Sequence, residues 1–169
     1  NFLFNFGIEG SRDGEFRYPS GVAYDPNNDR IIVVDTKNNR IQVFDKDGNF
    51  LFNFGIEGSE DGEFNEPHGV AYDPNNDRII VADSWNDRIQ VFDSNGNFLF
   101  NFGIEGSEDG EFNLPSGVAY DPNNDRIIVV DTWNHRIQVF DSNGNFLFNF
   151  GIEGSRDGEF RYPSGVAYD

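Results

Sequence analysis

A unit of 48 residues repeats along this chain. The string NFLFNFGIEG starts at Asn1, Asn49, Asn97 and Asn145, and residues 145–169 copy residues 1–25 letter for letter. A fixed period of about 40–50 residues is typical of solenoids and propellers. The period divides the chain into repeats 1–48, 49–96 and 97–144 and a partial repeat 145–169. We therefore expect one domain of stacked units.

The composition supports a folded core. Hydrophobic residues make up 37% of the chain and include 19 phenylalanines. No apolar run approaches the roughly 18 residues that cross a bilayer, and no basic-then-apolar leader is present, so neither a membrane-spanning nor a signal segment is expected. The absence of cysteine excludes disulfides and thiolate metal sites.

The charge balance limits the classes of partner. The formal net charge is −18, and a chain this acidic repels phosphate backbones, which usually bind Lys and Arg. Nucleic acid is therefore not expected as a partner. The charge suits a soluble extracellular surface that attracts cations or basic partners.

Each unit contains four segments with strand character. In the first unit they are residues 21–25 (GVAYD), 30–35 (RIIVVD), 40–45 (RIQVFD) and 50–54 (FLFNF), rich in β-branched and aromatic residues. The Asp47-Gly48 pair predicts a hairpin turn before the fourth strand. No window shows an apolar period of 3.6 residues, so helices are not expected. Four antiparallel strands per unit describe one blade of an all-β propeller.

The phenylalanines explain why blades must stack. Phe50, Phe52 and Phe54 project from one face of the outer strand, and Phe44 lies on the neighbouring strand. A single four-stranded sheet cannot bury these rings alone, so adjacent blades are expected to sandwich them. Each buried Phe stabilises the fold by roughly 1.5–3 kcal/mol.

The repeated wording resembles a known family. The patterns P-x-G-V-A-x-D, V-[VA]-D-[ST]-x-N-x-R-I-Q-V-F-D and G-x-F-L-F-x-F-G are similar to the NHL repeat and recur through the units. The resemblance implies propellers that typically have six blades and mostly bind proteins or RNA, with a minority of related metal-dependent enzymes. This chain departs from the RNA-binding members, whose binding face is positive. Near-identical units also suggest recent amplification or engineering.

Counting strands gives three complete blades, with an outer strand expected at residues 2–6 and a lone inner strand at residues 165–169. Three blades cannot close a ring, and open flanks would expose apolar rings and strand edges. Two copies would supply six blades, so a closed homodimer is favoured. Further repeats of the same chain, a filament and a seven-bladed ring remain alternatives.

Differences between units concentrate in two loops. Units one and two differ at 10 of 48 positions, and seven of these lie in the connector before the inner strand or in the loop between the second and third strands. Both loops should emerge on the same side of the disc. We therefore expect a ligand- or partner-binding face there, with these candidates: Arg12, Arg17, Tyr18, Lys37, His68, Trp85, Trp133 and His135. Trp85 and Trp133 can alternatively pack on the neighbouring connector.

The same loops carry recurring residues with a structural interpretation. An acid and an arginine lie five residues apart in every unit, which predicts loop-closing ion pairs: Asp35 with Arg40, Asp83 with Arg88, and Asp131 with Arg136. Asn38, Asn86 and Asn134 are expected to supply a left-handed or capping turn position.

Metal and enzyme signals are weak. The run Asp45-Lys-Asp47-Gly-Asn49 resembles half of a calcium loop without its distal Glu, so weak calcium binding is possible, but a hairpin turn explains the same letters. Two histidines at unlike positions make a metal triad improbable, and no nucleophile–base pattern occurs. We expect no catalytic residues, metal or cofactor. A non-enzymatic binding scaffold is the first hypothesis, a structural self-assembling protein the second and a metal-dependent enzyme the third.

Overall fold

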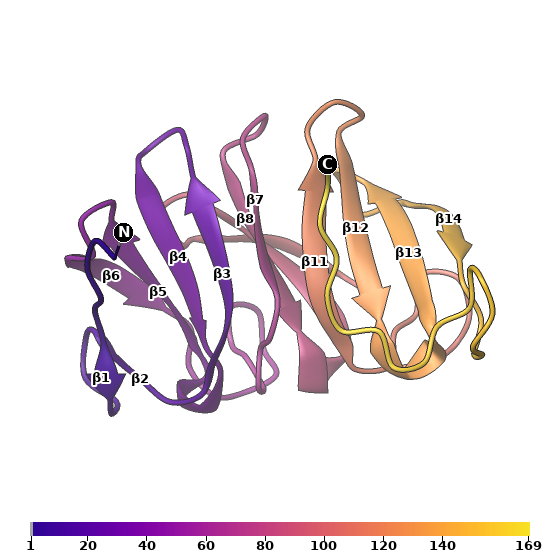
Figure 1. Ribbon diagram of the computed structural model, residues 1–169, viewed down its shortest axis with the longest axis horizontal. Coiled ribbons are helices and arrows are strands. Elements are labelled where there is room, and N and C mark those ends of the chain that lie inside the picture. The colour runs from indigo at the N-terminus through magenta and orange to yellow at the C-terminus, as the bar shows by residue number, and fades with distance from the viewer. Residues whose placement is uncertain (1) are drawn as a thin grey trace.

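The computed structural model describes residues 2–169 and contains three four-stranded antiparallel sheets. Blade one comprises β3 (Pro19–Asp25), β4 (Arg30–Asp35), β5 (Arg40–Asp45) and β6 (Phe50–Phe54). Blade two comprises β7 (Val70–Asp73), β8 (Arg78–Asp83), β9 (Arg88–Asp93) and β10 (Phe98–Phe102). Blade three comprises β11 (Pro115–Asp121), β12 (Arg126–Asp131), β13 (Arg136–Asp141) and β14 (Phe146–Phe150). Figure 1 shows the blades side by side in chain order.

The strands agree closely with the sequence pattern. Each sheet runs in chain order from its inner to its outer strand, which confirms the all-β propeller blade. A short 3-10 turn follows each second strand: η1 (Thr36–Asn38), η2 (Ser84–Asn86) and η3 (Thr132–Asn134). None of the helices in residues 2–169 is long and apolar enough to cross a membrane.

Two terminal strands were predicted wrongly. Residues 2–6 and 165–169 are not in a strand; instead β1 (Ile8–Glu9) and β2 (Glu15–Phe16) form a short parallel pair inside the first connector. A strand requires backbone hydrogen bonds to a neighbouring strand, and neither terminal segment is paired in this way among the described residues. Their side chains nevertheless lie at repeat-equivalent places, since the ring centroid of Phe6 is 4.9 Å from that of Phe44, as Phe54 is from Phe92.

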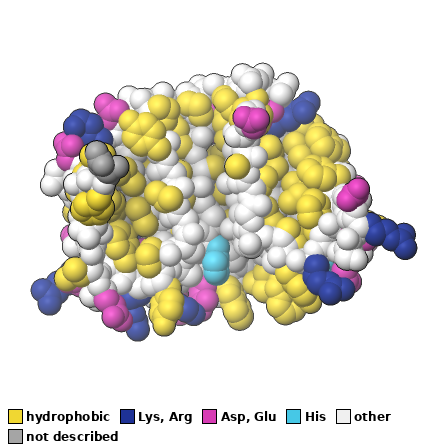
Figure 2. All heavy atoms as spheres, in the orientation of Figure 1, with side chains coloured by type: hydrophobic (Ala, Val, Ile, Leu, Met, Phe, Trp, Pro, Cys, Tyr) yellow, Lys and Arg dark blue, Asp and Glu magenta, His cyan; other side chains and the backbone are white. Residues whose placement is uncertain are grey.

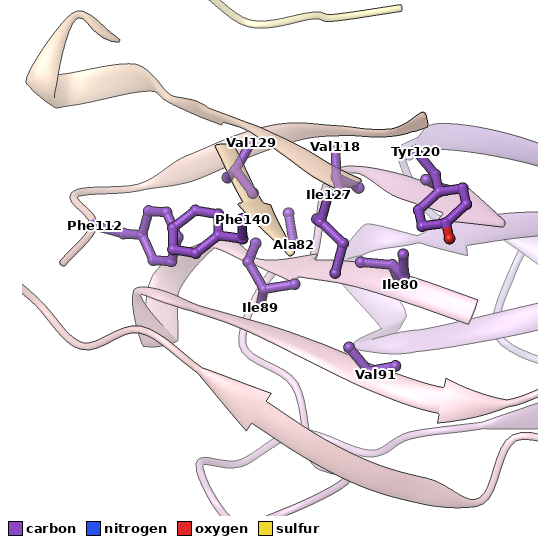
Figure 3. Close-up of a cluster of buried hydrophobic side chains, with 11 residues drawn as sticks. Ile80, Ala82, Ile89, Val91, Phe112, Val118, Tyr120, Ile127, Val129 and Phe140 are labelled. Atoms are coloured by element: carbon purple, nitrogen blue, oxygen red, sulfur yellow. The ribbon is translucent and has the colours of Figure 1, made fainter. Parts of the chain in front are cut away.

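The core lies between the blades. Figure 3 shows Ile80, Ala82 and Ile89 of blade two facing Ile127 and Phe140 of blade three. A matching cluster joins blades one and two. The connector phenylalanines Phe64 and Phe112 are completely buried in these clusters, so each connector is anchored to the core by its ring.

The inner strands approach one another closely at a recurring glycine. A Cβ atom placed on Gly69 would lie 2.5 Å from the carbonyl oxygen of Ser116, and one on Gly21 would lie 2.5 Å from that of His68. Such distances are sterically forbidden, so the glycine of the P-x-G-V pattern is required by the packing of neighbouring blades.

Candidate binding face

The two variable loops lie on one side of the molecule. In each blade the loop after the second strand meets the connector that leads into that blade: the Lys37 N–H donates to the Arg17 carbonyl (3.0 Å) and the Trp85 N–H to the Asn65 carbonyl (3.1 Å). We call this side, which comprises residues 55–69 and 84–87 and their counterparts in the other units, the variable face. It forms the lower edge of the molecule in Figure 1.

A buried polar network lies inside each blade, beneath the loops of the variable face. Arg88 Nε lies 2.8 Å from Asp83 Oδ2, and the same pair occurs as Arg40–Asp35 at 2.8 Å and Arg136–Asp131 at 2.7 Å. Each aspartate side chain is fully buried. Burial raises the pKa of Asp83, although hydrogen bonds from Asn65, Asn86 and Arg88 oppose the shift. Recurrence in each blade and complete burial make these pairs structural.

A glutamine on the third strand ties the connector to this network. Gln90 Nε2 donates to the Glu63 carbonyl (2.6 Å) and to Asp83 Oδ2 (3.0 Å), while its Oε1 accepts from the Gly62 N–H (3.0 Å). Gln42 and Gln138 make the same contacts in their own units. This role of the glutamine was not predicted from the sequence. Its signal was a polar residue kept inside the apolar third strand of every unit.

The left-handed residue of the loop is one position later than predicted. Asn39, Asp87 and His135 have φ of 50°, 50° and 54°, whereas Asn86 lies inside η2 and donates to Asp83 Oδ2 (2.9 Å). Asn38, Asn86 and Asn134 lie inside the 3-10 turns and cap neither end, so neither alternative of the prediction fits them. Because a left-handed position favours short polar residues, it still tolerates the variation that the sequence shows there.

Trp85 and Trp133 project from the variable face. Their exposed fractions are 57% and 55%. Both line one hollow of about 240 Å³ between blades two and three, whose wall also includes His68, Leu114 and Ser116. Figure 2 shows hydrophobic side chains protruding between charged ones along this edge. The hollow can therefore receive an apolar or planar group from solution.

The two histidines occupy different surroundings. His68 Nδ1 lies 2.9 Å from the Glu66 carbonyl and 3.1 Å from Ser84 Oγ, where the first unit has a Ser20–Thr36 hydroxyl pair at 2.6 Å. His135 accepts a hydrogen bond from the Tyr162 N–H (3.2 Å). Residues 2–169 contain no group of three His, Cys, Asp or Glu side chains arranged to hold a metal ion.

The basic candidates lie on the first unit. Arg12 pairs loosely with Glu15 (3.7 Å), and Lys37 Nζ lies 2.5 Å from Glu66 Oε1 of the next connector. Arg17 and Tyr18 are exposed. The structure thus places all eight candidates on the variable face, with Trp85, Trp133 and His68 around one hollow and Arg17 and Tyr18 beside another.

The half calcium loop is a hairpin turn. Asp45 Oδ1 accepts from the Asp47 and Asn49 N–H groups (2.9 Å each), and its Oδ2 accepts from Asn49 Nδ2 (2.8 Å). These bonds, first the one from the Asn49 side chain, lower the pKa of Asp45. The carboxylate oxygens are thus used to close the turn.

Comparison with known proteins shows where such units occur. Over 47 residues the chain is 53% identical to protein lin-41 of Caenorhabditis elegans, and over 43 residues it is 58% identical to protein brain tumor of Drosophila melanogaster. These matches cover 28% and 25% of this chain and 4% of each relative. The chain thus spans a small fraction of the curated relatives that it matches.

Solved structures share the fold at low sequence identity. A chain of the nidogen/laminin complex superposes with a TM-score of 0.68 at 22% identity, covering 91% of this chain and 53% of that one. Kuenenia stuttgartiensis hydrazine synthase superposes with a TM-score of 0.67 at 13% identity, covering 94% of this chain and 41% of that one. At these identities the likeness concerns the fold alone.

The family follows from the repeat itself. The model of the NHL repeat matches residues 16–44, 64–92 and 112–140, which make up 87 of the 169 residues. Each match begins at the connector phenylalanine and ends at the phenylalanine of the third strand, so it contains the end of the connector and the whole loop after the second strand. This chain belongs to the NHL-repeat family.

Proposed function

We propose that this chain is a non-enzymatic binding scaffold that recognises a protein partner through the variable face. The observation that carries the proposal is the pair of half-exposed tryptophans around one hollow. Tryptophan is enriched among residues that dominate binding energy at protein interfaces. The buried network stabilises the loops that carry both tryptophans, through Asn86 bonded to Asp83 and Asn134 bonded to Asp131.

The charge of the surface indicates the chemistry of the partner. Unit two, which carries Trp85, has two basic and ten acidic residues, a net charge of −8, and unit three has two and eight, a net charge of −6. Such a field attracts positive segments over long range and repels phosphate backbones. We therefore propose a basic protein segment that places an apolar or planar group in the hollow.

Binding of an oligo-arginine peptide tests this proposal. The two tryptophans are the sole ones in the chain, so their fluorescence reports directly on the hollow, and calorimetry gives the affinity. We expect W85A/W133A to weaken binding at least about tenfold, the effect of losing roughly 1.4 kcal/mol. The matched control L51A/L99A removes exposed apolar side chains from the outer strands and should leave affinity unchanged.

Other probes show what would contradict the proposal. An oligo-glutamate peptide and single-stranded RNA should not bind at physiological salt. Equal affinity of the parent and W85A/W133A would exclude the variable face as the site. Salt-dependent, sub-micromolar binding of the RNA would replace a protein partner with a nucleic acid. Stoichiometric metal in elemental analysis would instead revive a metal-dependent enzyme.

A structural role in which copies close a ring is supported by the flanks. Phe148 and Phe150 on the outer side of blade three, and Val22 and Tyr24 on the outer side of blade one, are exposed. Figure 2 shows broad hydrophobic patches over these two blades. Two copies with six blades would bury both flanks, and light scattering should then give twice the chain mass of 19.2 kDa. The chain mass itself, or an open-ended mass series, would exclude a closed dimer.

A further inference from the structure

The contacts between neighbouring blades on the variable face differ in their chemistry. At the first boundary Lys37 Nζ of blade one lies 2.5 Å from Glu66 Oε1, and Asn39 Oδ1 accepts from the Glu66 N–H (2.8 Å). This boundary is therefore ionic. The residue that receives both contacts, Glu66, has left-handed φ of 45° and belongs to the connector of blade two.

The second and third boundaries use the same positions with different residues. Asp87 Oδ1 accepts from the Leu114 N–H (2.8 Å), and Trp85 lines the hollow that Leu114 also lines. At the third boundary the rings of Trp133 and His135 lie edge-on to Tyr162, with centroids 5.9 and 4.6 Å away. The second boundary is apolar and the third is aromatic.

Variation between the units is thus matched across each boundary. A lysine faces a glutamate, a tryptophan faces a leucine, and a tryptophan with a histidine faces a tyrosine. Exchanging one member would place a charge against an aromatic ring or leave a lysine beside an apolar side chain. Such mismatches disfavour wrong pairings, in the way that natural interfaces achieve specificity.

Blade one carries the receiving side of a fourth boundary. Tyr18 is equivalent to Glu66, Leu114 and Tyr162, has φ of 51° and is exposed. Beside it lies a hollow of about 530 Å³ lined by residues that include Ile8, Glu9, Arg17 and Tyr18. Gly7 also lines this hollow. In the other connectors the glycine equivalent to Gly7 lies against the backbone of the preceding loop, as Gly151 lies against the His135 carbonyl oxygen. The hollow has the place that such a loop fills elsewhere.

We propose that these contacts form a pairing code that directs a second copy of this chain to insert its Trp133–His135 loop into the hollow beside Tyr18. The proposal rests on the ring closure proposed above and names the residues that select the partner. Unit one is identical to residues 145–169 over its first 25 residues. The contact of Tyr162 with Trp133 and His135 therefore shows the chemistry that Tyr18 offers to the same loop.

Docking replaces segments of one copy with segments of identical sequence from the other, and it leaves the three sheets of each copy intact. In the second copy, residues 151–169 contain no strand of three or more residues, so they can yield to residues 7–25 of the first copy, which include β3 with its ladder to β4. In the first copy, residues 2–6 form no strand and yield to β14 of the second copy. Each displaced contact is replaced by an identical one, and the exposed flanks are buried.

Transplanting the first pairing into the boundary between copies tests the code. Y18E gives the receiving tyrosine of unit one the residue of unit two, which mismatches Trp133 and His135 of the second copy. Tyr162 is kept, so the contact inside the free chain is unchanged. We expect the dissociation constant of its dimer to be at least about tenfold higher than that of the parent dimer, which corresponds to roughly 1.4 kcal/mol. Adding W133K/H135N recreates the Lys37, Asn39 and Glu66 set and should restore the dimer. L51E/L99E adds two charges on exposed outer-strand positions and should not change the association.

The outcomes separate the code from ring closure. A parent that dimerises no more tightly than Y18E, or a triple variant Y18E/W133K/H135N that does not recover, would overturn the code while leaving closure intact. A parent that remains monomeric at every concentration in light scattering would overturn both. W85A alone separates the peptide-binding test from both results, because Trp85 lines the hollow between blades two and three whereas Trp133 also contacts Tyr162.

Discussion

The outer side of blade one and the boundary between blades one and two contain the same residues in opposite environments. Val22 is 69% exposed and Tyr24 51%, whereas their repeat equivalents Val70 and Tyr72 are 7% and 8% exposed. The register of these residues with the second strand is the same, although β3 is longer than β7. The neighbouring blade, and not the residue type, therefore decides whether these apolar side chains contribute to the core.

In contrast to these apolar side chains, the buried polar network has the same geometry in blades one and two. Gln42 and Gln90 donate to their connector carbonyls at 2.6 Å in both blades, and Arg40 and Arg88 lie 2.8 Å from their aspartates. These bonds join residues within one unit. An open flank therefore leaves each blade with its polar scaffold complete and its apolar face uncovered.

The largest effect on stability is expected when a connector phenylalanine is removed. Phe112→Ala should lower the free energy of unfolding by about 3–5 kcal/mol, because Phe112 is completely buried between blades. Phe16→Ala, at the equivalent place on the open flank, should cost clearly less, since Phe16 is only half-buried. Urea denaturation of both variants at low protein concentration measures the difference. Equal losses would contradict it and would indicate that the flank of blade one is covered in solution.

A smaller effect is expected for the tyrosines of the inner strands. Tyr72 is buried and donates to Asp77, so Tyr72→Phe should lower the free energy of unfolding by about 1–2 kcal/mol at neutral pH. Tyr24 makes the same bond to Asp29 from an exposed position. Tyr24→Phe should therefore cause no measurable change in the same urea titration.

The pH dependence of the free energy of unfolding provides a further test of the Tyr72–Asp77 hydrogen bond. The hydrogen bond from Tyr72 is the main cause that lowers the pKa of Asp77 from its ordinary value of 3.8. A carboxyl group whose folded pKa is depressed adds stability that is present above its unfolded pKa and is lost as pH falls through the folded one. The stability gap between the parent and Tyr72→Phe should thus narrow below about pH 4. A gap that widens on acidification would exclude this explanation.

The smallest effect is expected for the ion pair at the first boundary. The side chains of Lys37 and Glu66 are 45% and 29% exposed, so water screens their attraction. Lys37→Glu or Glu66→Lys alone should destabilise by about 0.2–1 kcal/mol, and the K37E/E66K swap should recover most of it. Thermal unfolding of this cycle at low and high salt measures the coupling. A coupling energy unaffected by salt would be inconsistent with a screened pair.

Several elements followed from the sequence because their causes are local. The second strand, residues 30–35, and the hairpin at Asp47-Gly48 appear where β-branched residues and turn residues predicted them. The left-handed position was misplaced by one residue, since Asn38 and Asn39 are both asparagines and only the backbone shows which one has positive φ. The strand expected at residues 2–6 was wrong because pairing depends on a neighbour and not on composition.

The location of the variable positions was predicted from the sequence, but their contacts across the blade boundaries were not. The variable positions were found from the differences between units, and they do lie on one face. That Lys37 meets Glu66, and that His135 meets Tyr162, was not legible, because each contact joins residues 27 to 29 positions apart in adjacent blades. Part of the variable face therefore forms the boundaries between blades.

By itself the sequence determined the repeat, the four strands of each blade and the loops in which the units differ, because period, alternation and turn chemistry act within a few residues. The tertiary structure alone decided which side chains are buried, which loop residues pair across a boundary and which tryptophans remain available. Those properties depend on atoms supplied by the next blade, about 48 residues away along the chain, and local preference contains no information about them.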